Sequence, residues 1–150
     1  MKIVASNKKA YFNYEIIESL EAGISLLGSE VKSIREGRVS LKDSYAEIRN
    51  GEVFLLHMQI SPYEQANIFN HDPLREKKLL LHRQQIKRLI GKIREKSYTL
   101  VPTKVMFNEK GRVKVEISLA KGKRAYEKKR AIKERELDRE VRAALKKRLR

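Results

Sequence analysis

The chain has 150 residues, a formal net charge of +16 and a pI near 10.1, which together allow one small basic domain with an extension. Its basicity favours nucleic acid or an anionic membrane surface as the partner. Cysteine is absent, which excludes disulfides and thiolate metal sites, and no apolar run reaches the length of a membrane span or a signal-peptide core, so we expect a cytoplasmic protein.

The first third of the chain predicts two strands and a helix from its apolar alternation and turn residues. These elements are a strand over residues 11–18, a turn at Ala22-Gly23, a second strand over residues 24–27 and a helix over residues 29–36. Ser29 is the expected N-cap of the helix, and Gly37 is expected to end it. Lys32 and Arg35 then lie on the outer side of this helix.

The middle of the chain contains two strong local signals. Asn50-Gly51 suits a two-residue type I′ turn and predicts a hairpin between strands over residues 44–49 and 52–57. Asp72-Pro73 has the residue types of a helix N-cap and first helical position, so we predict a helix start there. A basic, leucine-rich segment follows over residues 74–83.

The last part of the body predicts a helix and a second hairpin. The helix ends near Lys96, and its core face is Ile86, Leu89, Ile90 and Ile93. The hairpin strands cover residues 98–107 and 112–119; the second alternates apolar and polar residues, as a strand with one wet face does. Pro102 should mark a sheet edge or a bulge.

About six short strands and two or three helices result, with no internal repeat. Closing the strands on themselves would remove exposed sheet edges. We therefore predict a mainly β fold, a small closed OB-like barrel with flanking helices over residues 1–120, followed by a basic C-terminal tail over residues 121–150.

The tail has 14 Lys and Arg against 5 Asp and Glu. Like charges four residues apart outnumber opposite charges, so an isolated helix would be weakened by repulsion. A polyanion would reverse that repulsion, and we predict that the tail becomes helical on binding nucleic acid. Tyr126 has no core to join and is a candidate for stacking on bases.

No catalytic or metal-binding pattern is found. His57, His71 and His82 are scattered and are best read as surface or strand-end side chains. The glycines form no phosphate-binding loop. Glu21, Glu30 and Asp43 could bind a metal together, but the sequence gives no reason to expect that they lie close to one another. We expect no enzyme activity, no cofactor, no metal and no small-molecule substrate.

Six stretches, in order, resemble the small protein B family, the tmRNA-binding proteins of bacterial trans-translation. They are Asn7-Lys8-Lys9-Ala10, Glu21-Ala22-Gly23-Ile24, residues 28–35 with Gly37, Ile60-Ser61-Pro62-Tyr63, Lys78-Leu79-Leu80-Leu81 and Lys121-Gly122-Lys123-Arg124. The resemblance implies an OB-like barrel that binds the tRNA-like domain of tmRNA. It also implies a tail that enters the empty mRNA channel of a stalled small ribosomal subunit and becomes helical there.

The resemblance and the basic clusters together supply the expected site residues. For tmRNA these are Asn7, Lys8, Lys9, Tyr11, Glu21, Lys32, Arg35, Lys77 and Lys78. For the decoding centre and mRNA channel they are Lys121, Gly122, Lys123, Arg124, Tyr126, Glu127, Lys128, Lys129, Arg130 and Lys133. The family often has histidine where Phe12 and Tyr126 stand here. We expect the protein to act as a monomer.

Three other functions fit a small basic chain. A structural ribosomal protein with an RNA-buried extension has the same composition. A basic amphipathic segment on a membrane surface is disfavoured because the tail lacks Trp and Phe. An RNA-modifying enzyme is disfavoured because no catalytic constellation is visible.

Overall fold

The computed structural model describes residues 2–63 and 70–122, and these form nine strands and three helices. In chain order the elements are β1 (Lys2–Ser6), α1 (Lys8–Asn13), β2 (Tyr14–Ile24), α2 (Gly28–Arg35), β3 (Val39–Ser40), β4 (Tyr45–Arg49), β5 (Glu52–Leu56), β6 (Gln59–Ile60), β7 (Lys77–Leu80), α3 (Arg83–Lys96), β8 (Thr99–Phe107) and β9 (Val113–Gly122). None of these helices combines the length and hydropathy needed to cross a membrane.

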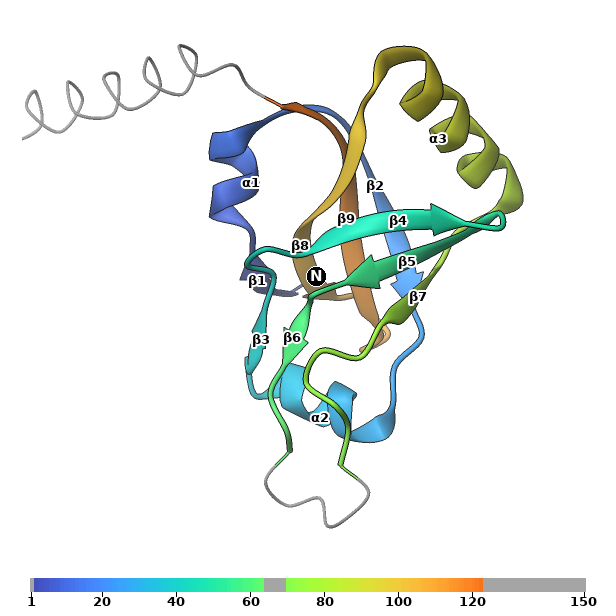
Figure 1. Cartoon of the computed structure of the whole chain (residues 1–150). Coiled ribbons are helices and arrows are strands. Elements are labelled where there is room, and N and C mark those ends of the chain that lie inside the picture. The colour runs from blue at the N-terminus through green and yellow to red at the C-terminus, as the bar shows by residue number, and fades with distance from the viewer. Residues whose placement is uncertain (1, 64–69, 123–150) are drawn as a thin grey trace, which may run out of the picture.

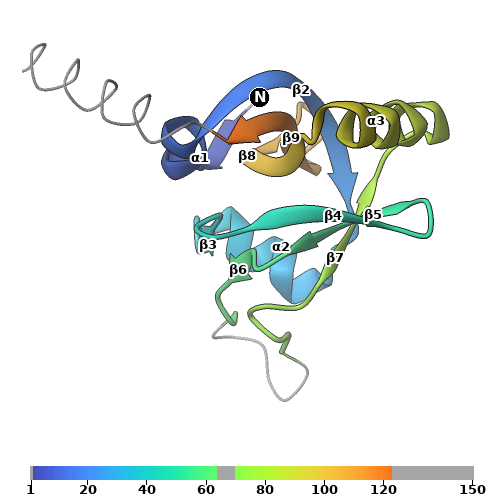
Figure 2. The same cartoon turned by 45° about the horizontal axis from the view of Figure 1, so that its top comes forward.

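Six of the strands close into a ring. They pair in the order β8-β4-β5-β7-β2-β9, and β9 pairs back onto β8. β1 continues the edge of β8 beyond β4, and β3 pairs with β6 as a separate ribbon. Figures 1 and 2 show α2 at one end of this ring and α3 beside the β4–β5 turn. The prediction of a mainly β closed barrel with flanking helices is confirmed.

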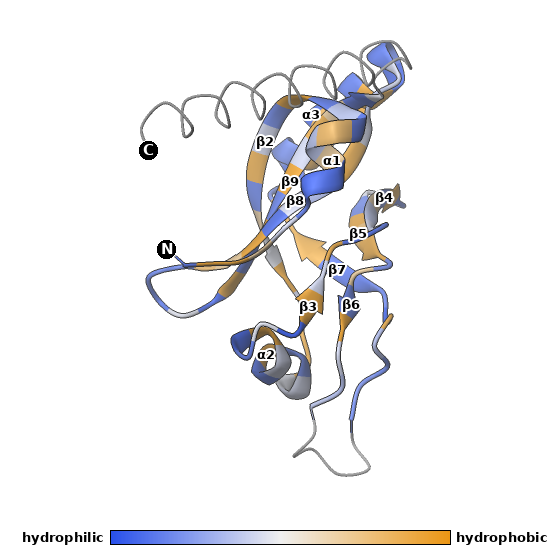
Figure 3. Ribbon diagram, turned by 90° about the vertical axis from the view of Figure 1, so that its left-hand side faces the viewer, coloured by the Kyte–Doolittle hydropathy of each residue, from blue (hydrophilic) through white to orange (hydrophobic). Residues whose placement is uncertain are grey.

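The core of the barrel comes from alternate residues of the ring strands. Val115, Ile117 and Leu119 of β9 are fully buried, as their spacing predicted, and Leu89 of α3 and Ile34 of α2 close the two ends. Figure 3 shows the same alternation of hydrophobic and hydrophilic residues along β2. Apolar burial of this kind stabilises a fold by roughly 25 cal/mol per Å² removed from water.

Several local predictions are confirmed. Asn50 and Gly51 both have positive φ, 51° and 76°, as a type I′ turn requires, and they join β4 to β5. The helix predicted to end near Lys96 is α3, and the second hairpin is β8–β9. Pro102 lies next to a shift in the β8–β9 register, so it does mark a bulge.

The prediction of a strand over residues 11–18 is wrong for its first three residues, which belong to helix α1. The Asn7 side chain accepts a hydrogen bond from Ala10 N at 3.2 Å and caps this helix. Its Nδ2 donates to the carbonyls of Pro102 at 3.0 Å and Leu41 at 3.4 Å. These tertiary bonds place a helical turn where the apolar alternation indicated a strand.

The predicted turn at Ala22-Gly23 is also wrong, because β2 runs without a break to Ile24. Gly23 pairs with Lys114 of β9 on one side and Leu80 of β7 on the other. A Cβ at Gly23 would lie 3.2 Å from the Leu80 Cβ, so the glycine allows close strand approach.

Residues 2–6, for which no element was predicted, form strand β1. Three further features differ from the predictions. Leu27, not Ser29, precedes α2, and Leu27 N donates to Glu30 Oε1 at 2.7 Å. Asp72-Pro73 begins a turn in which Leu74 N donates to Asp72 Oδ1, and strand β7 follows in place of a helix because it pairs with β5 and β2. Ser118 is buried, so the wet face of β9 ends before it.

Glu18 ties the barrel to α3. Its carboxylate accepts from Arg88 Nη1 and Lys92 Nζ, each at 2.6 Å. The hydrogen bond from Lys92, and the positive charges of Arg88 and Lys92, hold the pKa of Glu18 below its ordinary value, although partial burial opposes them. A carboxylate with a depressed folded-state pKa adds stability above its unfolded pKa and loses it as the pH falls.

We therefore expect Glu18→Gln to lower the free energy of unfolding at pH 7 by roughly 0.5–1 kcal/mol. The difference from the wild type should shrink as the pH falls below about 4.3, the ordinary value of a glutamate pKa. Urea denaturation at several pH values measures this. Glu15→Gln, an exposed change on the same strand, is the matched control. A loss that does not depend on pH would contradict the ion-pair assignment.

Candidate nucleic-acid interface

Lys8 and Lys9 open helix α1 and are both exposed. Asn7 just before them is only 8% exposed, and its side-chain bonds to Ala10, Pro102 and Leu41 are internal. The three predicted tmRNA contacts therefore have different roles. Asn7 holds the helix in place, and Lys8 and Lys9 are exposed to the solvent. Tyr11, on the same helix, is 40% exposed and can offer a ring face to a base.

Lys32 and Arg35 are exposed on the outer side of α2, as predicted. The Lys32 ammonium lies 5.4 Å from the ring centroid of Tyr63, within cation–π range. Figure 1 shows α2 at the end of the barrel away from α1. These two cations and the Lys8–Lys9 pair therefore cannot form one continuous cluster.

The prediction that Lys77 binds RNA is wrong, because its side chain is fully buried. Its Nζ donates to the carbonyls of Arg75 at 2.6 Å and Met58 at 3.1 Å. Burial lowers the pKa of Lys77, and the nearby charge of Glu30 partly offsets that effect. Lys78, the next residue, is exposed and pairs with Glu52 at 3.1 Å. Only Lys78 remains available to a partner.

A buried ion pair fixes α2 against the segment that leads into β7. Glu30 is fully buried, and its two oxygens accept from Arg75 Nη2 at 2.7 Å and Arg75 Nε at 3.2 Å. Glu30 Oε1 also accepts from Leu27 N, which caps the helix. Burying a charge is costly unless it is paired and hydrogen-bonded in this way.

Glu21 is exposed on β2, directly opposite Glu116 on β9. Glu116 pairs with Lys104 at 3.6 Å. Together with Ile3, which is 54% exposed, these residues line a hollow of about 280 Å³. Glu21 is therefore separate from Lys8 and Lys9, although β1 runs from Ile3 in this hollow towards α1.

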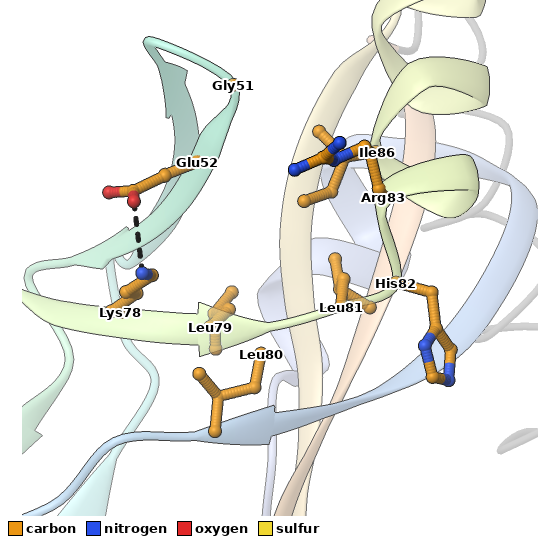
Figure 4. Close-up of a pocket in the computed structure, with 9 residues that line it drawn as sticks. All are labelled: Gly51, Glu52, Lys78, Leu79, Leu80, Leu81, His82, Arg83 and Ile86. Carbon is orange, nitrogen blue, oxygen red and sulfur yellow. Dashed lines mark hydrogen bonds and ion pairs between the residues drawn. The ribbon is translucent and has the colours of Figure 1, made fainter.

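The sequence reasoning missed Leu80, which is 53% exposed on β7. It lies in a hollow of about 440 Å³ that is lined by apolar Leu79, Leu81 and Ile86, by Arg83 and by the Lys78–Glu52 ion pair (Figure 4). The alternation of side chains along β7 could have predicted this exposure. If Lys77 and Leu79 point inward, Lys78 and Leu80 must point outward. An exposed leucine beside charged side chains is suited to contact a base or ribose.

His71 corrects the prediction that the histidines are surface or strand-end groups. It is buried, with Nδ1 2.9 Å from Ser29 Oγ and Nε2 2.9 Å from Ile60 O. His57 stacks on Tyr45 with ring centroids 5.4 Å apart, and His82 is exposed before α3. Within residues 2–63 and 70–122, no cluster of three His, Cys, Asp or Glu side chains could hold a metal ion.

Lys121 and Gly122 are the last residues of β9, exposed and paired with Glu15 and Tyr14. The other predicted tail residues lie outside the described part of the chain: Lys123, Arg124, Tyr126, Glu127, Lys128, Lys129, Arg130 and Lys133.

A family model described as SmpB protein matches residues 4–147. The chain belongs to the SmpB protein family. The SsrA-binding protein of Symbiobacterium thermophilum is 60% identical over 142 residues, which are 95% of this chain and 90% of that protein. The SsrA-binding protein of Thermosipho africanus is 53% identical over 146 residues, 97% of this chain and 98% of that protein.

A solved SmpB structure has a similar fold. It is described as "tmRNA-SmpB: a journey to the center of the bacterial ribosome" and is 44% identical, with a TM-score of 0.69 over 88% of this chain and 95% of that chain. The resemblance drawn from six short motifs is therefore confirmed at the level of the SmpB family, over nearly the whole chain.

Proposed function

We propose that this SmpB-family chain is an RNA-binding factor of trans-translation. Its barrel binds the tRNA-like domain of tmRNA, and its tail probes the empty mRNA channel and decoding centre of stalled ribosomes. The observation that carries the proposal is the near full-length match to SsrA-binding proteins at 53–60% identity. The similar fold of a solved SmpB that is described together with tmRNA supports it.

The barrel has the properties that recognition of a structured RNA needs. A closed ring of strands is rigid, and exposed cations on α1 and β7 can contact phosphates and ribose hydroxyls, which identify RNA by shape and not by a base code. Lys8, Lys9 and Lys78 supply positive charge, and Leu80 supplies an apolar contact beside them on β7. Glu21 is anionic and acts by organising the RNA-facing surface.

The tail completes the proposal. Lys121 and Gly122 lead out of β9, and the residues after them carry a strongly positive charge. Such a segment is attracted to ribosomal RNA and gains helix stability when phosphates neutralise its repulsive pairs. The alternative of a structural ribosomal protein explains the charge equally well, but it does not account for the match to SsrA-binding proteins. We expect a monomer without enzyme activity, acting in the bacterial cytoplasm.

The test measures the affinity of the full chain for the tRNA-like domain of tmRNA, with an ordinary tRNA as competitor. We expect preference for the tmRNA fragment, and we expect Lys8→Ala with Lys9→Ala to weaken binding because two exposed cations are lost. Each lost phosphate contact should reduce the slope of log affinity against log salt concentration by about 0.9. Equal binding of both RNAs by the wild type would overturn the proposed function; unchanged binding by the double variant would remove only α1 from the interface.

A further inference from the structure

A hollow of about 360 Å³ lies where the end of β1, the start of α1 and the segment after β3 meet. Figures 1 and 2 show α1 and β3 on the same side of the barrel, away from α3 and the β4–β5 turn. Three lysines line this hollow: Lys8 and Lys9 from α1, and Lys42 from the segment between β3 and β4. The hydroxyl-bearing residues Ser6 and Ser40 line it as well.

Lys42 is held beside α1 by a set of internal bonds. The Asn7 side chain donates to the carbonyl of Leu41, which joins the start of α1 to this segment, and Leu41 is itself in the core. The turn is closed by Ser44, whose N and Oγ both donate to the same carbonyl. Lys42 N donates to Ser40 Oγ at 3.2 Å. The backbone of Lys42 is therefore fixed, while its side chain is exposed.

Within residues 2–63 and 70–122, the ammonium groups of Lys8, Lys9 and Lys42 have no anionic partner. No ion pair between these described residues involves any of the three lysines. Three other surface lysines of the barrel do have carboxylate partners: Lys78 pairs with Glu52, Lys92 with Glu18 and Lys104 with Glu116. Like charges brought together without a counter-charge repel each other, and an anion in the hollow would relieve this repulsion. Ser6 and Ser40 add hydroxyls of the kind that bind phosphate oxygens.

We propose that Lys42 completes a binding site for an RNA backbone phosphate together with Lys8 and Lys9. This inference rests on the proposed function, because it makes the tRNA-like domain of tmRNA the source of the phosphate. It adds to that function a cation from the β3–β4 segment, which neither the basic clusters nor the family motifs indicated. The site reads no base, since ammonium groups and hydroxyls contact phosphate without sequence preference.

The test compares Lys42→Ala with Lys110→Ala. Lys110 is a matched control: it is an exposed lysine without an ion pair, in the β8–β9 turn, and its N likewise donates to a side chain two residues earlier, Asn108 Oδ1. Both changes remove one positive charge from the whole protein. Affinity for the tRNA-like domain is measured across a salt series, and thermal unfolding confirms that both variants keep the wild-type stability.

We expect Lys42→Ala to weaken binding several-fold at low salt and to reduce the log–log salt slope by about 0.9, with the loss shrinking as salt rises. Lys42→Arg should retain the slope, and Lys110→Ala should match the wild type. Equal slopes for Lys42→Ala and Lys110→Ala would overturn the site. If the wild type bound tmRNA no better than tRNA, the proposed function would fail, whereas the comparison of the two variants on tRNA would still show whether the hollow holds a phosphate.

Discussion

Truncation after Gly122 is expected to abolish tagging of nascent chains on stalled ribosomes while leaving tmRNA binding largely intact. All elements of the described barrel, and its exposed cations on α1, α2 and β7, precede this cut. The cut keeps β9 whole, including the pairs of Lys121 with Glu15 and Gly122 with Tyr14. The removed residues carry 13 Lys and Arg against 5 Asp and Glu, the charge that we propose contacts the mRNA channel.

Two assays separate the roles. Filter binding of the truncated chain to the tRNA-like domain measures the barrel alone, because the polycationic tail is absent from it. Tagging in a reconstituted translation system, with an mRNA that lacks a stop codon, measures the tail. A chain in which residues 123–150 are shuffled keeps the charge and is the matched control. Normal tagging by the truncated chain would contradict the division of labour, and full rescue by the shuffled tail would show that charge alone suffices.

Glu30→Ala is expected to lower the free energy of unfolding by about 3 kcal/mol, the largest effect on stability that we predict for a single polar residue. The change leaves the backbone N–H of Leu27 without its acceptor and the Arg75 guanidinium without its carboxylate, so that Arg75 keeps only the carbonyls of Ser25 and Glu76. It also removes the negative charge that favours the buried ammonium of Lys77. Water cannot fully replace the lost carboxylate, since the Lys77 side chain is fully buried and the Arg75 side chain is only one-third exposed.

Urea denaturation at neutral pH measures this loss. Glu36→Ala is the matched control because Glu36 follows α2 but has a side chain that is 45% exposed, so its removal should change stability by less than about 1 kcal/mol. A loss for Glu30→Ala no larger than that of the control would mean that the ion pair does not hold α2 to the β7 segment.

Short-range sequence patterns were enough to predict the elements whose conformation depends on neighbouring residues. Asn50-Gly51 formed the predicted turn because positive φ at both positions is a local property of those two residues. The apolar spacing of α3 and β9 was read correctly because each has one face packed on the core. The closed barrel was also predicted correctly, because a set of strands exposes sheet edges that closure removes.

Elements that depend on distant partners were not predicted. Residues 8–13 are helical because Asn7 bonds to Leu41 and Pro102, which lie 34 and 95 positions away. Strand β7 replaces a helix because β5 and β2 pair with it on both sides. The burial of Lys77 and His71 depends on carbonyls and hydroxyls that other elements supply. Most of these partners lie far away in the chain or in another element, so a short window of the sequence does not contain them.

The sequence by itself determined the class of partner, through its net charge, and the SmpB family, through six short stretches in order. This was possible because the net charge and the family motifs are properties of the residues and their order, and do not depend on how the chain folds. Only the tertiary structure decided which cations face the solvent. It turned Lys77 inward, because strand side chains alternate and Leu79 must join the core. It also brought Lys42 beside Lys8 and Lys9, because Asn7 fastens two segments that lie far apart in the chain.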